Sequence, residues 1–262
     1  MKIWAHRGCS QQYPENTMTA FAKAAQLEGL TGIELDIQMT KDGEIVVIHD
    51  ERVDRTTDGI GYVRDYTYAE LRKLSIETGQ RRKEKIPSIQ EVLDLLQAGM
   101  EAGLLLNIEL KNSVIPCPGM EEKIMELTAR RNLHDQVIYS SFYTMFLQKI
   151  RGMDADASVG VLDTKVSDCF YKQRGCFGTG SAQMEKRGQE QILRTALHPF
   201  WKGMDFTKEQ LQGQTVRAWF GGHLYPEKPT GTRLALGKLE EMGITDVFLN
   251  EPERYLRQRE SR

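Results

Sequence analysis

Polar side chains on otherwise apolar strands are the residues of this chain best suited to chemistry. Glu34 and Asp36 are two positions apart in an apolar run, so a strand would place both side chains on one face. Asn107, Glu109 and Lys111 alternate with leucine and isoleucine in the same way. Like charges crowded on a buried face are costly unless a cation offsets them. We therefore expect these two strands to form the walls of a metal or phosphate site.

Other titratable residues lie where apolar runs end. His6 and Arg7 follow the first run, and His49 closes Val46-Val47-Ile48. Because imidazole exchanges protons near neutral pH, the two histidines are candidates for a general acid and base. Arg7 and Lys111 are suited to hold a phosphate, or alternatively to balance the carboxylates.

The acidic residues indicate which metal such a site would bind. Glu34, Asp36 and Glu109 supply three carboxylates and no cysteine ligand, a set that favours a hard divalent cation, Mg²⁺ or Ca²⁺. Each acid taken alone would be interpreted as a surface charge or an ion-pair partner. Three of them on apolar strands favour a metal site.

Short apolar strands alternate with amphipathic helices along the chain. The expected strands are Lys2–His6, Gly32–Thr40, Leu104–Lys111, Gln136–Ser140, Ser158–Leu162, Thr195–Pro199, Thr215–Phe220 and Thr245–Leu249. The expected helices are Thr17–Glu28, Ile89–Ala98, Glu121–Arg130, Tyr143–Gly152, Thr207–Leu211 and Thr232–Met242. Eight such strands predict a (β/α)8 TIM barrel, in which active sites lie at the carboxyl ends of the strands. An open doubly wound sheet is the alternative, but no Gly-x-Gly-x-x-Gly turn follows the first strand.

Two segments interrupt this alternation within a single domain expected to span residues 1–262. Residues 41–43 predict a hairpin turn, and a small insertion of about residues 50–87 then follows the second strand. The glycine-containing segment Asp163–Gln189 is expected to be a loop over the active-site mouth. It would act as a lid or specificity element, or else be a surface excursion.

Composition limits the partners and the compartment. The net charge is −2, which gives no general attraction for nucleic acid. No apolar run approaches the ~20 residues of a membrane span, and the first residues resemble a core strand rather than a signal peptide. The four cysteines form no Cys-x-x-Cys pair, so reduced thiols in the cytoplasm are expected. The oligomeric state is left open.

Several motifs in a fixed order resemble the glycerophosphodiester phosphodiesterase family across almost the whole chain. They are His6-Arg7-Gly8, Pro14-Glu15-Asn16-Thr17, Glu34-Leu35-Asp36, Thr40-Lys41-Asp42-Gly43, Val46-Val47-Ile48-His49-Asp50, Asp54-Arg55-Thr56-Thr57-Asp58-Gly59, Ile86-Pro87-Ser88-Ile89, Asn107-Ile108-Glu109-Leu110-Lys111 and Ser140-Ser141-Phe142. The resemblance implies a TIM barrel and a metal-dependent enzyme that releases sn-glycerol 3-phosphate and an alcohol from a small-molecule glycerophosphodiester.

The same resemblance implies a role for each matching residue. Glu34, Asp36 and Glu109 would bind the metal, and His6 and His49 would be the acid–base pair. In addition, Arg7 and Lys111 would hold the phosphate, while Phe142 and Trp219 would line the substrate pocket. Attack on phosphorus by the glycerol 2-hydroxyl, giving a cyclic phosphate, and direct attack by water would use the same residues.

The last third of the chain departs from the family pattern. Trp219 is followed by Phe220-Gly221-Gly222 where the family commonly has Thr-Val-Asn, and Leu249-Asn250-Glu251-Pro252 replaces a Thr-Asp-x-Pro ending. These departures concern the alcohol side of the substrate. Two alternative functions are kept beside the main one: a lysophospholipase D acting on lysophospholipids, and a catalytically silent phosphate-binding barrel. The lipid enzyme would need an apolar rim or anchor, and stable membrane association is not expected.

Overall fold

The computed structural model describes residues 1–76, 83–112, 114–177, 194–220 and 234–256. Its first elements are β1 (Lys2–His6), α1 (Met18–Ala25), β2 (Gly32–Met39), β3 (Ile45–Val47), η1 (Val63–Asp65), α2 (Tyr68–Leu71), α3 (Ile89–Glu101) and β4 (Leu105–Leu110). The next are α4 (Met120–Ala129), η2 (His134–Gln136), β5 (Val137–Ser141), α5 (Thr144–Met153), β6 (Ser158–Asp163) and α6 (Val166–Phe177). The last are β7 (Thr195–Pro199), β8 (Arg217–Trp219), α8 (Leu236–Glu241), β9 (Asp246–Leu249) and α9 (Glu253–Leu256).

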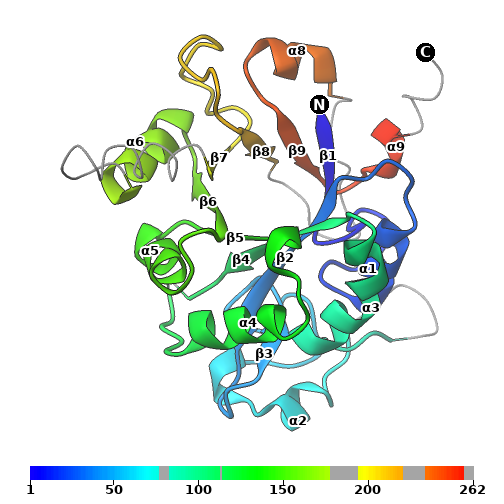
Figure 1. The fold of residues 1–262 in the computed structure, drawn as a ribbon. Coiled ribbons are helices and arrows are strands. Elements are labelled where there is room, and N and C mark those ends of the chain that lie inside the picture. Colours follow the sequence, from blue (N-terminus) through cyan, green and yellow to red (C-terminus); the bar gives the residue numbers. More distant parts are fainter. Residues whose placement is uncertain (77–82, 113, 178–193, 221–233, 257–262) are drawn as a thin grey trace.

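The parallel strands form a barrel. Their order is β7-β6-β5-β4-β2-β1-β9-β8, with β3 paired antiparallel to β2 outside this path. Two isolated parallel bridges, Leu197 to Val216 and Phe200 to Trp219, join β7 to β8 and bring the ring close to closure. Helices alternate with these strands (Figure 1). The predicted (β/α)8 barrel is therefore confirmed in place of the open sheet.

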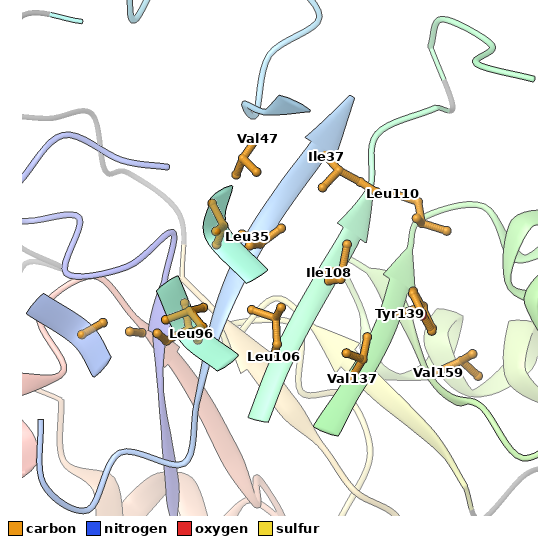
Figure 2. Packing of buried hydrophobic residues seen from close by; sticks show 14 of the residues in the cluster. Leu35, Ile37, Val47, Leu96, Leu106, Ile108, Leu110, Val137, Tyr139 and Val159 are labelled. Atoms are coloured by element: carbon orange, nitrogen blue, oxygen red, sulfur yellow. The ribbon is translucent and has the colours of Figure 1, made fainter. Parts of the chain in front are cut away.

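The apolar face of each early strand packs outward against the helices. Leu35 and Ile37 of β2 lie with Ile108 of β4 and Leu96 of α3 in one buried cluster (Figure 2). The α3 helix begins at a capping box, in which Ser88 and Glu91 satisfy each other's backbone N–H groups. Because side chains alternate along a strand, this outward packing turns the polar residues of β2 and β4 into the barrel.

Two glycines make room for large side chains inside the barrel. A Cβ atom on Gly32 would lie 2.4 Å from the Trp4 ring, and one on Gly160 would lie 2.2 Å from the His198 ring. Trp4 and His198 are both completely buried. The interior is therefore filled by side chains from β1 and β7, and the cavity lies above them at the carboxyl ends of the strands.

The chain between β3 and α3 packs around a small apolar cluster of its own. This cluster consists of Val46, Ile48, Val53, Val63, Leu71, Ile76 and Ile86. The predicted hairpin turn precedes it, with Gly43 at a φ of 78° and β3 antiparallel to β2. We interpret the segment as the insertion expected from the sequence.

Two expectations about local structure were wrong. Residues 166–177 of the predicted loop Asp163–Gln189 form helix α6, whose Val166, Cys169 and Gln173 are buried; residues 178–189 lie outside the described part. The predicted helix Thr207–Leu211 is a series of turns instead. Gly213 follows the segment at a φ of 82°, a left-handed conformation that does not continue a helix.

Candidate active site

Three buried carboxylates meet where β2 pairs with β4. The strand register places Glu34 opposite Asn107 and Asp36 opposite Glu109. One oxygen from each of Glu34, Asp36 and Glu109 lies within 4.8 Å of the others, and all three residues are buried. The predicted convergence of these acids is thus present in the structure.

The electrostatics of this cluster differ from one carboxylate to the next. Burial, together with the charges of Asp36 and Glu109, raises the pKa of Glu34 well above its usual value. Burial also opposes ionisation of Asp36, but the charges of Arg7 and Lys111, with a hydrogen bond from Asn16, outweigh it and lower the pKa of Asp36. No hydrogen bond reaches Oδ1 of Asp36, although that atom is buried. A divalent cation fits such a set of hard, buried oxygen ligands.

Arg7 and Lys111 place their cationic groups beside these acids. Nε of Arg7 is 3.3 Å from Oδ2 of Asp36, and Nζ of Lys111 is 2.7 Å from Oε1 of Glu109. The backbone of Arg7 adopts a φ of 54°, and its N–H donates to Oε2 of Glu34 at 3.0 Å. A non-glycine residue at positive φ is uncommon and costs energy. The hydrogen bond to Glu34 helps to keep Arg7 in this conformation, which places its side chain next to the acids.

Both predicted histidines are held through Nδ1. In His6 this atom is 2.8 Å from the amide oxygen of Asn250, and in His49 it is 2.6 Å from Oδ1 of Asp50. Each partner oxygen accepts a hydrogen bond, so Nδ1 carries the proton in both rings. Nε2 of His6 then lies 3.7 Å from Oε2 of Glu34, and Nε2 of His49 lies 2.9 Å from Nζ of Lys111. The Nε2 atom of each ring therefore faces the charged cluster.

Sequence reasoning assigned no role to the residues that support these groups. Asn16 donates to Oδ2 of Asp36 at 2.9 Å, and Glu15 accepts from Arg7 at 2.8 Å. Arg55 also bonds Glu15, by two hydrogen bonds of 2.8 Å. These residues belong to the motifs Pro14-Glu15-Asn16-Thr17 and Asp54-Arg55-Thr56, so the signal was present. Their partners were not evident, because those partners are distant in the sequence.

One cavity of about 470 Å³ is lined by most of the predicted site residues. They are His6, His49, Arg7, Lys111, Phe142, Trp219, Glu34 and Glu109. Its second half is apolar. The Phe142 and Trp219 rings lie 6.2 Å apart in an edge-to-face arrangement, and Leu162, His198 and Phe248 also line the cavity. Burial and the nearby Arg217 charge lower the pKa of His198 well below its usual value, so this ring is neutral.

Comparisons with known proteins identify the family. The model of the glycerophosphoryl diester phosphodiesterase family matches residues 6–168. A glycerophosphodiester phosphodiesterase of Bacillus altitudinis is 35% identical over 273 residues, covering 99% of this chain and 98% of the relative. This chain therefore belongs to the glycerophosphoryl diester phosphodiesterase family, a family of enzymes, as its motifs predicted.

Two further relatives extend this result. A glycerophosphodiester phosphodiesterase of Caldanaerobacter subterraneus subsp. tengcongensis is 44% identical over 163 residues, which span 61% of this chain and 65% of the relative. A phosphodiesterase of Oleispira antarctica, solved in complex with the product sn-glycerol-3-phosphate, superposes with a TM-score of 0.71 at 25% identity. That alignment covers 100% of this chain and 97% of the other. Within the described residues, the helices are too short or too polar to cross a membrane.

Proposed function

We propose that this protein hydrolyses glycerophosphodiesters to sn-glycerol 3-phosphate and an alcohol. The observation that carries the proposal is one cavity lined by two histidines, two cations and two carboxylates, namely His6, His49, Arg7, Lys111, Glu34 and Glu109. An oxygen of the fully buried Asp36 lies within 4.8 Å of the two glutamates. The family membership and the product bound by the Oleispira antarctica relative support the same substrate class.

In this proposal Glu34, Asp36 and Glu109 hold a divalent cation, Mg²⁺ or Ca²⁺. When bound, such an ion offsets negative charge on the phosphate oxygens. The separation of the three oxygens supports this role, as does Oδ1 of Asp36, which is buried without a hydrogen bond and lies 3.6 Å from Nζ of Lys111.

His6 and His49 act as the acid–base pair. Because Asn250 and Asp50 hold the Nδ1 protons, each Nε2 can accept a proton from an attacking hydroxyl or, once protonated, donate one to the leaving alcohol. Attack by the glycerol 2-hydroxyl and attack by water both require this exchange. Arg7 and Lys111 bind the phosphate oxygens from the wall next to the acids.

Phe142 and Trp219 contact the alcohol portion of the substrate. Their edge-to-face pair belongs to the apolar part of the lining of the cavity that also contains the charged residues. An aromatic face there attracts a cationic head group such as choline.

An assay with two substrates tests the activity and separates it from the alternatives. The protein is incubated with glycerophosphocholine or lysophosphatidylcholine, with EDTA and after addition of Mg²⁺ or Ca²⁺. Release of glycerol 3-phosphate and choline from glycerophosphocholine, lost with EDTA and restored by the ion, is the expected result. Choline release only from lysophosphatidylcholine would indicate the lipid enzyme, and no product from either would indicate a silent barrel.

The compartment is part of the proposal. All four cysteines are free, which is typical of a reducing cytoplasm, and we expect neither nucleic acid nor a stable membrane partner. Cell fractionation with antibody detection tests the location.

A further inference from the structure

Arg55 connects two carboxylates that belong to different parts of the candidate active site. Its Nε and Nη2 atoms donate to the two oxygens of Asp50 at 2.6 and 3.0 Å. Its Nη1 and Nη2 atoms donate to the two oxygens of Glu15 at 2.8 Å each. The guanidinium therefore uses two of its edges, each against one carboxylate, which is the geometry of a bidentate arginine pair.

Each of the two carboxylates contacts a residue placed in the proposed mechanism. Oδ1 of Asp50 lies 2.6 Å from Nδ1 of His49, and Oε1 of Glu15 accepts from Nη1 of Arg7 at 2.8 Å. Asp50 and Arg55 come from the segment after β3, whereas Glu15 and Arg7 come from the segment after β1. Arg55 is thus the link between the His49 side of the cavity and the Arg7 side.

Without Arg55, the Asp50 carboxylate would keep its contact with His49 but lose the two bonds that fix its plane. Glu15 would retain only Arg7 as a cationic partner among the contacts described. Burial opposes ionisation of Asp50, and hydrogen bonds from His49 and Arg55 nonetheless lower its pKa, so the acid is a charged acceptor. An acceptor that can turn does not hold an imidazole in one orientation.

We propose that Arg55 is a positioning residue that fixes Asp50, and through Asp50 the His49 ring, in the orientation needed for proton exchange. The inference rests on the proposed function in that His49 is taken as an acid–base group. Arg55 also lines the cavity, but the role proposed for it is to hold Asp50 and requires no contact with the substrate. A lysine cannot replace it, because one ammonium cannot bind both carboxylates in a bidentate manner.

Kinetics of Arg55→Met and Arg55→Lys test this role. Both variants are expected to lower kcat for glycerophosphocholine by roughly 10- to 100-fold, the usual effect of removing a residue that orients a reactive group, with little change in KM. The matched control is Arg52→Met. It removes an exposed arginine that lies three positions before Arg55 and pairs with Asp54. That control should retain the wild-type kcat.

A double-mutant cycle shows whether Arg55 acts through Asp50. If it does, Arg55→Met should cost much less in an Asp50→Asn background than in the wild type, because residues that act together are not additive. Full additivity of the two losses, or a wild-type kcat in Arg55→Met, would overturn the proposal. A lower melting temperature with unchanged kcat would show that the ion pairs only stabilise the fold, and it would also overturn it.

Imidazole NMR provides a readout that needs no turnover. With ¹⁵N-labelled histidine, the Nδ1 and Nε2 resonances of His49, assigned with His49→Gln, should move toward a mixture of tautomers in Arg55→Met and stay unchanged in Arg52→Met. If the wild type proves inactive on every glycerophosphodiester, the proposed function fails and this spectrum alone decides the positioning role. Unaltered His49 resonances in Arg55→Met would contradict it.

Discussion

The ammonium nitrogen of Lys111 lies 2.9 Å from Nε2 of His49, so a candidate phosphate-binding cation touches a candidate acid–base group. The two residues come from different segments, since Lys111 follows β4 and His49 follows β3. Burial lowers the pKa of Lys111, but the charges of Glu109 and Asp36 raise it by more, so the ammonium stays charged. A phosphate oxygen that binds Lys111 would therefore lie within reach of His49.

Replacing either catalytic candidate, His6→Ala or His49→Ala, should lower kcat by roughly 10²-fold or more, because each removes one partner of the acid–base pair. Divalent ion binding should change little. His134→Ala is the control, since that histidine is about half exposed and pairs with Asp154 away from the cavity. A variant of His6 or His49 that keeps wild-type turnover would remove that residue from the mechanism.

Asp36→Asn should keep the fold and lower the affinity for Mg²⁺ or Ca²⁺ by roughly 10- to 100-fold, since it removes one formal charge from the proposed ligand set. Isothermal titration calorimetry measures the affinity. The exposed Asp65→Asn variant should bind like the wild type. Equal affinities in Asp36→Asn and the wild type would exclude these carboxylates as the metal site.

Glu34→Gln should stabilise the metal-free protein at neutral pH. The pKa of Glu34 is raised from 4.5 by burial and by Asp36 and Glu109, so the folded chain binds this proton more tightly than the unfolded chain does. The tighter proton binding contributes fully to the free energy of unfolding at pH values below the pKa that Glu34 has in the unfolded chain. This contribution is lost as pH rises through the pKa that Glu34 has in the folded chain. Glutamine stays neutral and avoids this loss.

Thermal melts in EDTA measure the effect of Glu34→Gln as a function of pH. The variant should melt higher near neutral pH, by roughly 2–4 °C for each kcal/mol, and this advantage should vanish at pH values below about 4.5. The exposed Glu101→Gln variant should show no such dependence. A melting temperature at neutral pH that is equal to or below that of the wild type would refute the prediction.

Trp219→Ala should change the relative kcat/KM values for glycerophosphocholine, glycerophosphoethanolamine and glycerophosphoglycerol, because the ring borders the apolar half of the cavity. The loss should be greatest for the quaternary ammonium substrate. Tyr171→Ala removes an exposed ring on α6 and serves as the control. A uniform fall for all three substrates would mean that Trp219 only supports the packing.

Gly160→Ala should destabilise the barrel by about 1–3 kcal/mol, because the new methyl group would meet the buried His198 ring. Denaturant unfolding gives the free energy. Gly152→Ala, on helix α5 with open space around it, should instead be neutral or raise stability by up to about 1 kcal/mol. The comparison fails if Gly160→Ala is as stable as Gly152→Ala.

The sequence was sufficient to predict the barrel and the carboxylate cluster, because both depend on local patterns. The barrel depends on the alternation of strands and helices, and the cluster depends on the alternation of side chains along a strand. Glu34 and Asp36 share a face on any strand, and β1 and β7 have the bounds expected for them. The Asn250 contact with His6 could not be read from spacing, because it joins residues 244 positions apart. Helix α6 was missed because its polar residues and Gly175 obscured the apolar side that packs on β6 and β7.

The two halves of the cavity come from different halves of the chain. Its carboxylates and cations belong to the first 111 residues, whereas Phe142, Leu162, Trp219 and Phe248 form the apolar half. A chimera that joins the first half of this chain to the second half of a relative should therefore retain the phosphate chemistry and acquire the donor's alcohol preference. The donor must supply one further group, a hydrogen-bond acceptor at the position of Asn250, because His6 depends on it.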